Sequence, residues 1–223
     1  MKIIKGTEQK VAYWSGGTTT QLAIWPEDAL YAERNFLWRL STATVDDEES
    51  VFTSLPDYQR FLGIRKGTLM LNHGNNSWLY MNTNKVTVFD GGAPTRSRGQ
   101  VTDMNLMIRK GEAEGAMQSV MVRKNLEGRC LREFMDMREA VQGSDLELCP
   151  ASKEPVAGDI FAIYHSSGAD ITLRLPEDMG GENMTLQAGD LAIWNLTDSW
   201  KLSRVLSCDD CHIFGFWVMR SVK

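Results

Sequence analysis

The most regular alternation of hydrophobic and polar positions lies between Phe36 and Val45. This segment is rich in aromatic and β-branched residues and lacks glycine and proline, which predicts a strand with a period of two. One face carries Phe36, Trp38, Leu40, Thr42 and Thr44, and the other carries Leu37, Arg39, Ser41, Ala43 and Val45. Both faces are apolar enough to be buried. The charge of Arg39 and the hydroxyl of Ser41 therefore need partners, because burying a charge without compensation is very costly.

A second clear alternation runs from Val101 to Arg109. It places Asp103, Asn105 and Met107 on one face of a strand, and Met104, Leu106 and Ile108 on the other. We expect Asp103 and Asn105 to meet Arg39, and Arg60 from a strand at 58–64, inside one barrel. Asp103 either contributes to a binding site there or neutralises one arginine in a buried structural pair. The pattern leaves both alternatives open.

Short strands with turn residues between them continue along the chain. The expected strands span 9–13, 20–25, 67–71, 78–81, 85–89, 158–164, 170–175, 184–186, 189–194, 200–202 and 212–219. Even spacing of this kind favours an all-β sandwich or barrel over βαβ units. Residues 129–138 fit a short amphipathic helix or a strand. At 189–190, glycine supplies a turn and Asp190 is expected to hydrogen-bond the turn backbone.

Four stretches resemble the HutD/Ves family. They are Trp14 to Pro26 with its Gly16-Gly17-Thr18, the strand Phe36 to Val45, Phe52-Thr53-Ser54-Leu55-Pro56 followed by Arg60, and Thr102 to Met107. Two positions depart from the family pattern: Met104 replaces a phenylalanine, and Ser50-Val51 precedes Phe52 where the family has a glycine. The match is specific over residues 14–107.

The resemblance implies an all-β double-stranded β-helix, which is the RmlC-like jelly roll of cupins, in a bicupin arrangement. The expected organisation is a first cupin barrel at 1–110, a connecting segment at 111–150, and a second cupin-like barrel at 151–223 packed on the first. The family also links the chain to histidine utilisation through HutD, and to stress response through Ves.

Composition and net charge limit the classes of partner that the protein is expected to bind. Hydrophobic residues make up 43% of the 223 positions, which is ample for a sizeable core. A formal net charge of −5 argues against nucleic acid and anionic membranes as partners. We find no apolar run long enough for a signal peptide or a membrane span, which predicts a cytoplasmic protein with reduced thiols at Cys130, Cys149, Cys208 and Cys211.

Metal and haem sites are not expected, and we predict no cofactor. A cupin metal site needs two histidines two residues apart on a strand, whereas the three histidines here are His73, His165 and His212. His73 is expected to be exposed in a turn. Cys208 to His212 matches the c-type haem signature, but no export signal or second axial ligand accompanies it. A hairpin turn is the favoured interpretation of that segment.

The remaining candidate site is a polar cluster in an apolar barrel. It comprises Arg39, Ser41, Arg60, Asp103 and Asn105, with Trp14, Trp38 and Phe52 as walls. Two guanidinium groups with one carboxylate leave a surplus positive charge, and arginine pairs well with carboxylates. We expect non-catalytic binding of a small carboxylate with a regulatory role; the family resemblance suggests a formylated or plain amino-dicarboxylate. A structural network joining the strands is the alternative.

Two rival functions stay open. The first is a metal-independent isomerase or lyase, with Asp103 as base and Arg39 stabilising negative charge. It ranks second because a carboxylate beside two arginines is expected to have a lowered pKa and to be a weak base. The second rival is a structural or partner-binding protein, whose tryptophan-rich second half buries a homodimer face.

Overall fold

The computed structural model describes residues 1–75, 77–122, 130, 158–196, 203–207 and 209–221. These residues form β-strands and a few single-turn 3₁₀ helices, among them η2 (Tyr31–Glu33), which confirms the all-β class. No helix in this part of the chain is long and apolar enough to cross a membrane. Contacts divide the chain into two compact units: unit 1 is Met1–Glu8 with Gln118–Met219, and unit 2 is Gln9–Met117 with Arg220–Lys223. The boundaries expected at 110 and 150 stay predictions.

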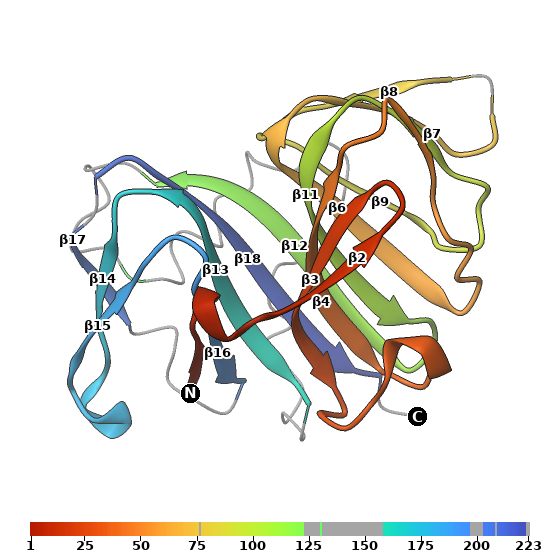
Figure 1. Cartoon of the computed structure of the whole chain (residues 1–223). Helices are drawn as coiled ribbons and strands as arrows, with labels where there is room; N and C mark the ends of the chain where they lie inside the picture. The colour runs from red at the N-terminus through yellow and green to blue at the C-terminus, as the bar shows by residue number, and fades with distance from the viewer. Residues whose placement is uncertain (76, 123–129, 131–157, 197–202, 208, 222–223) are drawn as a thin grey trace. The chain divides into compact units, whose positions relative to one another are not determined.

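Unit 2 contains two antiparallel sheets (Figure 1). The larger has the order β2-β3-β4-β11-β6-β9, and the smaller has the order β5-β10-β7-β8. Their strands are β2 (Lys10–Trp14), β3 (Gly17–Trp25), β4 (Trp38–Val45), β5 (Glu49–Val51), β6 (Tyr58–Gly67), β7 (Leu69–Asn72), β8 (Leu79–Met81), β9 (Val86–Asp90), β10 (Arg96–Arg98) and β11 (Val101–Arg109).

The two sheets of unit 2 enclose one hydrophobic cluster. It joins Leu62 and Ile64 of β6 to Leu69 and Leu71 of β7, so side chains of both sheets pack together. Strand β4 lies near the middle of the larger sheet, between β3 and β11. Both of its faces are buried, as expected: the exposed fraction of Leu40 on one face is 0%, and that of Arg39 on the other is 5%.

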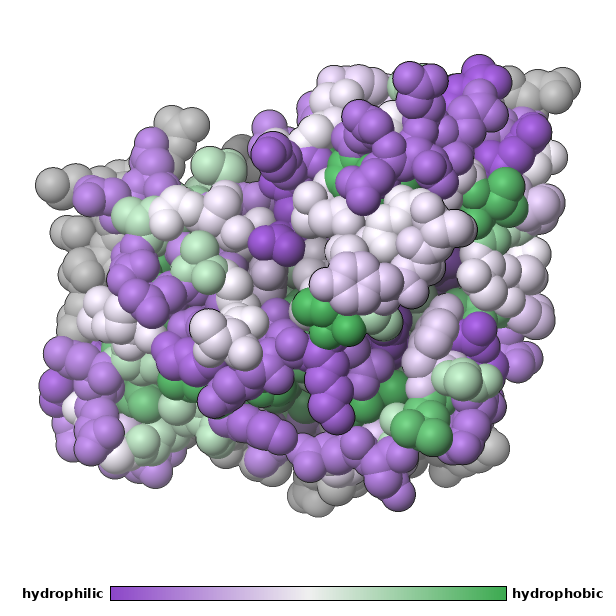
Figure 2. All heavy atoms as spheres, viewed as in Figure 1, coloured by the Kyte–Doolittle hydropathy of each residue, from purple (hydrophilic) through white to green (hydrophobic). Residues whose placement is uncertain are grey.

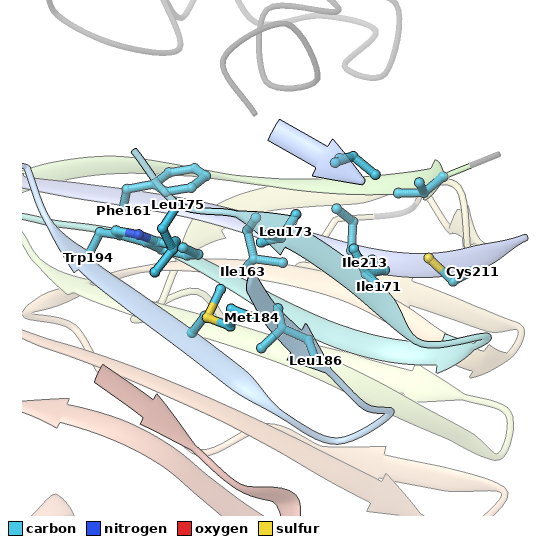
Figure 3. Close-up of a cluster of buried hydrophobic side chains, with 13 residues drawn as sticks. Phe161, Ile163, Ile171, Leu173, Leu175, Met184, Leu186, Trp194, Cys211 and Ile213 are labelled. Atoms are coloured by element: carbon cyan, nitrogen blue, oxygen red, sulfur yellow. The ribbon is translucent and has the colours of Figure 1, made fainter. Parts of the chain in front are cut away.

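Unit 1 has the same kind of construction. Its sheets have the orders β1-β16-β13-β18-β12 and β15-β14-β17. The strands are β1 (Lys2–Ile4), β12 (Ala113–Val122), which begins in unit 2, β13 (Ile160–Gly168), β14 (Ile171–Arg174), β15 (Asn183–Leu186), β16 (Leu191–Asn195), β17 (Arg204–Ser207) and β18 (Cys211–Arg220). Figure 3 shows the core between these sheets, where Phe161, Trp194 and Leu175 lie close together at one end of the cluster and Ile171, Ile213 and Cys211 lie at the other.

The described tryptophans of the second half are core residues. Trp194 is 0% exposed and Trp217 is 4% exposed, which is a correction to the idea that they form a homodimer face. A homodimer remains a prediction. Some of the sequence predictions fall outside the described residues. These are the strand expected at 200–202, the thiols Cys149 and Cys208, and the segment 129–138 except for Cys130.

Some large hydrophobic side chains remain exposed on the surface. The exposed ones include Tyr13, Val51 and Leu79. On the face shown in Figure 2, hydrophilic residues dominate and strongly hydrophobic ones form small separate groups. Single exposed apolar residues are usual on a protein surface.

Asp190 anchors the first strand of unit 1. Its side chain is almost fully buried and accepts hydrogen bonds from Nζ of Lys5 at 2.7 Å, from N–H of Gly6 at 3.1 Å and from N–H of Gln187 at 3.0 Å. The bond from Gln187 is the turn interaction expected from the sequence. Burial alone would raise the pKa of Asp190, but these donors outweigh it and the pKa lies below its ordinary value.

We expect Asp190→Ala to lower the free energy of unfolding by about 2–4 kcal/mol, because it removes the buried acceptor of two backbone N–H groups and of the Lys5 ammonium. Lys5→Met is the matched control. Lys5 is 45% exposed, so removing its ammonium should cost less than about 1 kcal/mol. Urea denaturation of both variants measures the difference. Equal losses in the two variants would show that the ion pair, not the backbone bonds, holds β1 in place.

Candidate functional site

The polar residues predicted from β4, β6 and β11 line one cavity in unit 2. The strand registers place Met107 of β11 opposite Arg39 of β4 on one side and opposite Arg60 of β6 on the other. Two residues earlier on β11, Asn105 lies opposite Ser41. Because neighbouring strands lie about 4.8 Å apart, this register brings two arginines from non-adjacent strands to the same row. The alternation of β4 and β11 was therefore predicted correctly.

Arg39 is buried and bonded to neutral groups. Its Nε donates to Oε1 of Gln21 at 2.9 Å, and its Nη1 donates to Oγ of Ser41 at 3.0 Å. The guanidinium carbon lies 4.4 Å from the centre of the Tyr31 ring. Burial lowers the pKa of Arg39 to about 10, so the side chain still carries its charge at neutral pH.

Arg60 has fewer partners. Its Nη2 donates to Oδ1 of Asn105 at 3.1 Å, and its guanidinium carbon lies 4.9 Å from the Phe52 ring centre and 5.3 Å from that of Phe89. Its Nε is buried and finds no acceptor among the described residues. Burial lowers the pKa of Arg60, opposed mainly by Asp103. A buried guanidinium with an unused donor is suited to receive an anionic ligand.

Asp103 differs from what the sequence predicted. Its Oδ1 accepts a hydrogen bond from N–H of Ala43 at 3.0 Å, and the described residues form no ion pair with it. Burial raises the pKa of Asp103 to about 7, and the opposing effects of the Ala43 N–H and the nearby arginines do not compensate. The expected lowering of this pKa was therefore wrong, because desolvation of the carboxylate outweighs its attraction to the arginines.

The cavity has a volume of about 380 Å³, within the range usual for small-molecule sites. Seven of the eight predicted site residues line it: Trp14, Arg39, Ser41, Phe52, Arg60, Asp103 and Asn105. Trp38 does not. It is buried on the opposite face of β4, because side chains of a strand alternate between faces, and its neighbour Arg39 takes the cavity side.

Sequence reasoning missed Tyr13, Tyr31 and Gln21. Tyr13 and Tyr31 line the cavity, and Gln21 bonds Arg39 from β3. Gln21 carried a usable signal, since an amide in a strand beside a buried arginine is a natural partner for it. Tyr31 begins the single-turn 3₁₀ helix η2, in a segment expected to be a loop, where no periodicity indicates the direction of a side chain.

His73 is partly buried, which corrects the prediction that it is exposed. Its Nδ1 lies 3.0 Å from Oγ1 of Thr95, and its ring centre lies 4.5 Å from that of Phe89. Burial and the charge of Arg60 both lower its pKa. No group of three or more potential metal ligands occurs among the described residues. Cys211 begins β18 and is buried.

A family model described as HutD matches residues 7–137, which is more than half of the chain. The chain belongs to the HutD family. This result confirms the resemblance inferred from the four sequence stretches. No curated protein matches the chain.

Solved structures of HutD-like and other cupin proteins resemble this HutD-family chain over nearly its whole length. A conserved protein of unknown function from Pseudomonas aeruginosa PAO1, PA5104, is 16% identical, with a TM-score of 0.68 and 98% of each chain covered. HutD from Pseudomonas fluorescens SBW25, in a formate condition, is 15% identical, with a TM-score of 0.62 and 99% of each chain covered.

The bacterial pirin YhhW from Escherichia coli, in complex with nickel(II), is 8% identical, with a TM-score of 0.62 and 99% of each chain covered. At these identities the likeness shows the fold alone. Because HutD and pirin are cupins, the fold is that of the cupins, as the sequence predicted. The bicupin arrangement stays a prediction.

Proposed function

We propose that this HutD-family protein binds a small carboxylate metabolite in the cavity of unit 2, with a regulatory role rather than turnover. The observation that carries the proposal is the charge of the cavity lining. Arg39 and Arg60 are both buried, and their hydrogen bonds go to the neutral side chains of Gln21, Ser41 and Asn105. Asp103 is the acidic residue of the lining. When ionised, its carboxylate compensates one of the two positive charges of Arg39 and Arg60, and the other remains.

An anionic ligand would relieve this imbalance. Arginine presents parallel N–H donors that match a carboxylate, and Nε of Arg60 has a donor to spare. The aromatic rings of Trp14, Tyr31 and Phe52 line the same cavity, which suits a ligand with a short carbon skeleton. Membership of the HutD family supports candidates from histidine utilisation, such as glutamate or its N-formyl derivative.

Thermal unfolding with a panel of acids tests the proposal. Formate, acetate, glutarate, glutamate and N-formylglutamate are added to the wild-type protein and to Arg39→Gln and Arg60→Gln. A ligand present at about one hundred times its Kd adds about 2.7 kcal/mol, or roughly 5–10 °C in Tm for a protein of this size. The shift should appear in the wild type and vanish in both variants.

Arg98→Gln is the matched control. Arg98 belongs to unit 2 but lies on β10, is 59% exposed and pairs with Glu49, so its replacement should leave the ligand-induced shift unchanged. The absence of a shift with every acid, or a shift that survives both cavity substitutions, would overturn the proposal.

A second function is favoured by the pKa of Asp103, which burial places at about 7. A carboxyl group with a pKa near neutrality is an effective general base, and a neighbouring guanidinium stabilises developing negative charge. Metal-independent proton abstraction from a bound acid is therefore the alternative. The test is exchange of a C–H proton of the bound acid in D₂O, followed by NMR. Exchange that occurs in the wild type and is lost in Asp103→Asn would show that the site catalyses proton abstraction and does not only bind the acid.

A further inference from the structure

The carboxyl group of Asp103 shares the cavity with the groups expected to hold the ligand. Asp103, Arg39 and Arg60 all line it. The charged groups that act on Asp103 come from both neighbouring strands: Arg39 from β4, and Arg60 and Arg65 from β6. Tyr31 and Arg34, from the segment before β4, affect the pKa values of the two cavity arginines. The charge of Arg60 in turn lowers the pKa of His73.

We infer that a dicarboxylate enters this cavity together with one proton, which Asp103 carries. The inference rests on the proposed function, because it specifies how the same site takes its ligand. Asp103 would then be the residue that sets the charge of the preferred ligand. No bond is formed or broken in the process other than that between the proton and the carboxylate oxygen.

Charge balance provides the first argument. Arg39 and Arg60 contribute two positive charges to the lining, and Asp103 contributes one negative charge when ionised. A monocarboxylate neutralises this set with Asp103 ionised, and a dicarboxylate neutralises it with Asp103 protonated. Because an unbalanced charge in a buried site is costly, a second ligand carboxylate should drive Asp103 to take up a proton.

The resting state of Asp103 provides the second argument. Its pKa of about 7 means that the free protein holds roughly half a proton there at neutral pH. A bound anion nearby raises the pKa of a carboxyl group further, because like charges disfavour the ionised form. At about pH 8, dicarboxylate binding should therefore take up close to one proton, and affinity should fall up to tenfold per pH unit above pH 7.

Proton uptake can be counted directly. Neutralised glutarate is added to the wild-type protein in weakly buffered solution at about pH 8, and the acid needed to restore the pH is measured. Glutarate should take up close to one proton per site, acetate less than half as much, and Asp103→Asn none with either. Asp90→Asn is the control: Asp90 is an exposed carboxylate of unit 2 paired with Lys110, and its loss should leave the uptake unchanged.

Infrared difference spectra of the wild-type protein provide a measurement that needs no variant. Glutarate should produce the carbonyl band of a protonated carboxyl group. Glutarate binding without proton uptake and without this band would overturn the inference while leaving carboxylate binding intact. If neither glutarate nor any other acid binds, the proposed function fails, and the inference fails with it.

Discussion

The Asp103→Asn variant should become increasingly more stable than the wild type as the pH rises. The pKa of Asp103 is about 7 in the folded protein, raised by burial from its ordinary value of 3.8. Between these two values the folded state binds more protons than the unfolded state, so the stability of the wild type falls with increasing pH across this window. A shift of about 3 pKa units corresponds to about 4 kcal/mol.

The measurement is the free energy of unfolding of wild type and Asp103→Asn at several values between about pH 4 and pH 8. The difference, variant minus wild type, should grow by about 4 kcal/mol from the lower to the upper end. The neutral amide is free of this dependence and can still accept the hydrogen bond from N–H of Ala43.

Asp90→Asn is a control, because the contribution of Asp90 to stability should depend on pH in the opposite direction. Its bond with Lys110 lowers the pKa of Asp90, as does the N–H of Gly92. The stabilising contribution of Asp90 is therefore present above its unfolded pKa and is lost as the pH falls through its folded pKa. A stability difference for Asp103→Asn that shrinks with increasing pH would show that the arginines, not burial, dominate its titration.

Trp194→Ala should lower the free energy of unfolding by about 3–5 kcal/mol, because it removes a large side chain from a packed core. Trp194 is 0% exposed and lies on β16, and its ring centre is 5.7 Å from that of Phe161. Figure 3 shows it packed among the core residues of unit 1. Urea denaturation followed by circular dichroism measures the loss.

Trp194→Phe separates packing from hydrogen bonding. Nε1 of Trp194 is buried and has no acceptor among the described residues, so replacing the indole by a phenyl ring removes volume but no hydrogen bond. We expect a loss of about 1–2 kcal/mol, well below that of alanine. If phenylalanine proves as costly as alanine, the indole N–H has a partner that stabilises the fold.

Much of the site follows from local sequence. The period-two patterns of β4 and β11 predicted which side chains share a face, and the family motifs predicted the cupin fold. The error over Trp38 was avoidable on the same rule, since it lies one residue from Arg39.

The sequence by itself therefore determined most of the strands, the family and seven of the eight predicted lining residues, because alternation along a strand is a local property. It did not predict the strands β1, β5, β10, β12 and β17. Only the tertiary structure decided that Tyr31 joins the cavity, that His73 is partly buried, and that Asp103 has a pKa of about 7 instead of a lowered one. These outcomes depend on how completely distant segments exclude water from a group. The energy of a buried charge is set by that exclusion as much as by its neighbours in sequence.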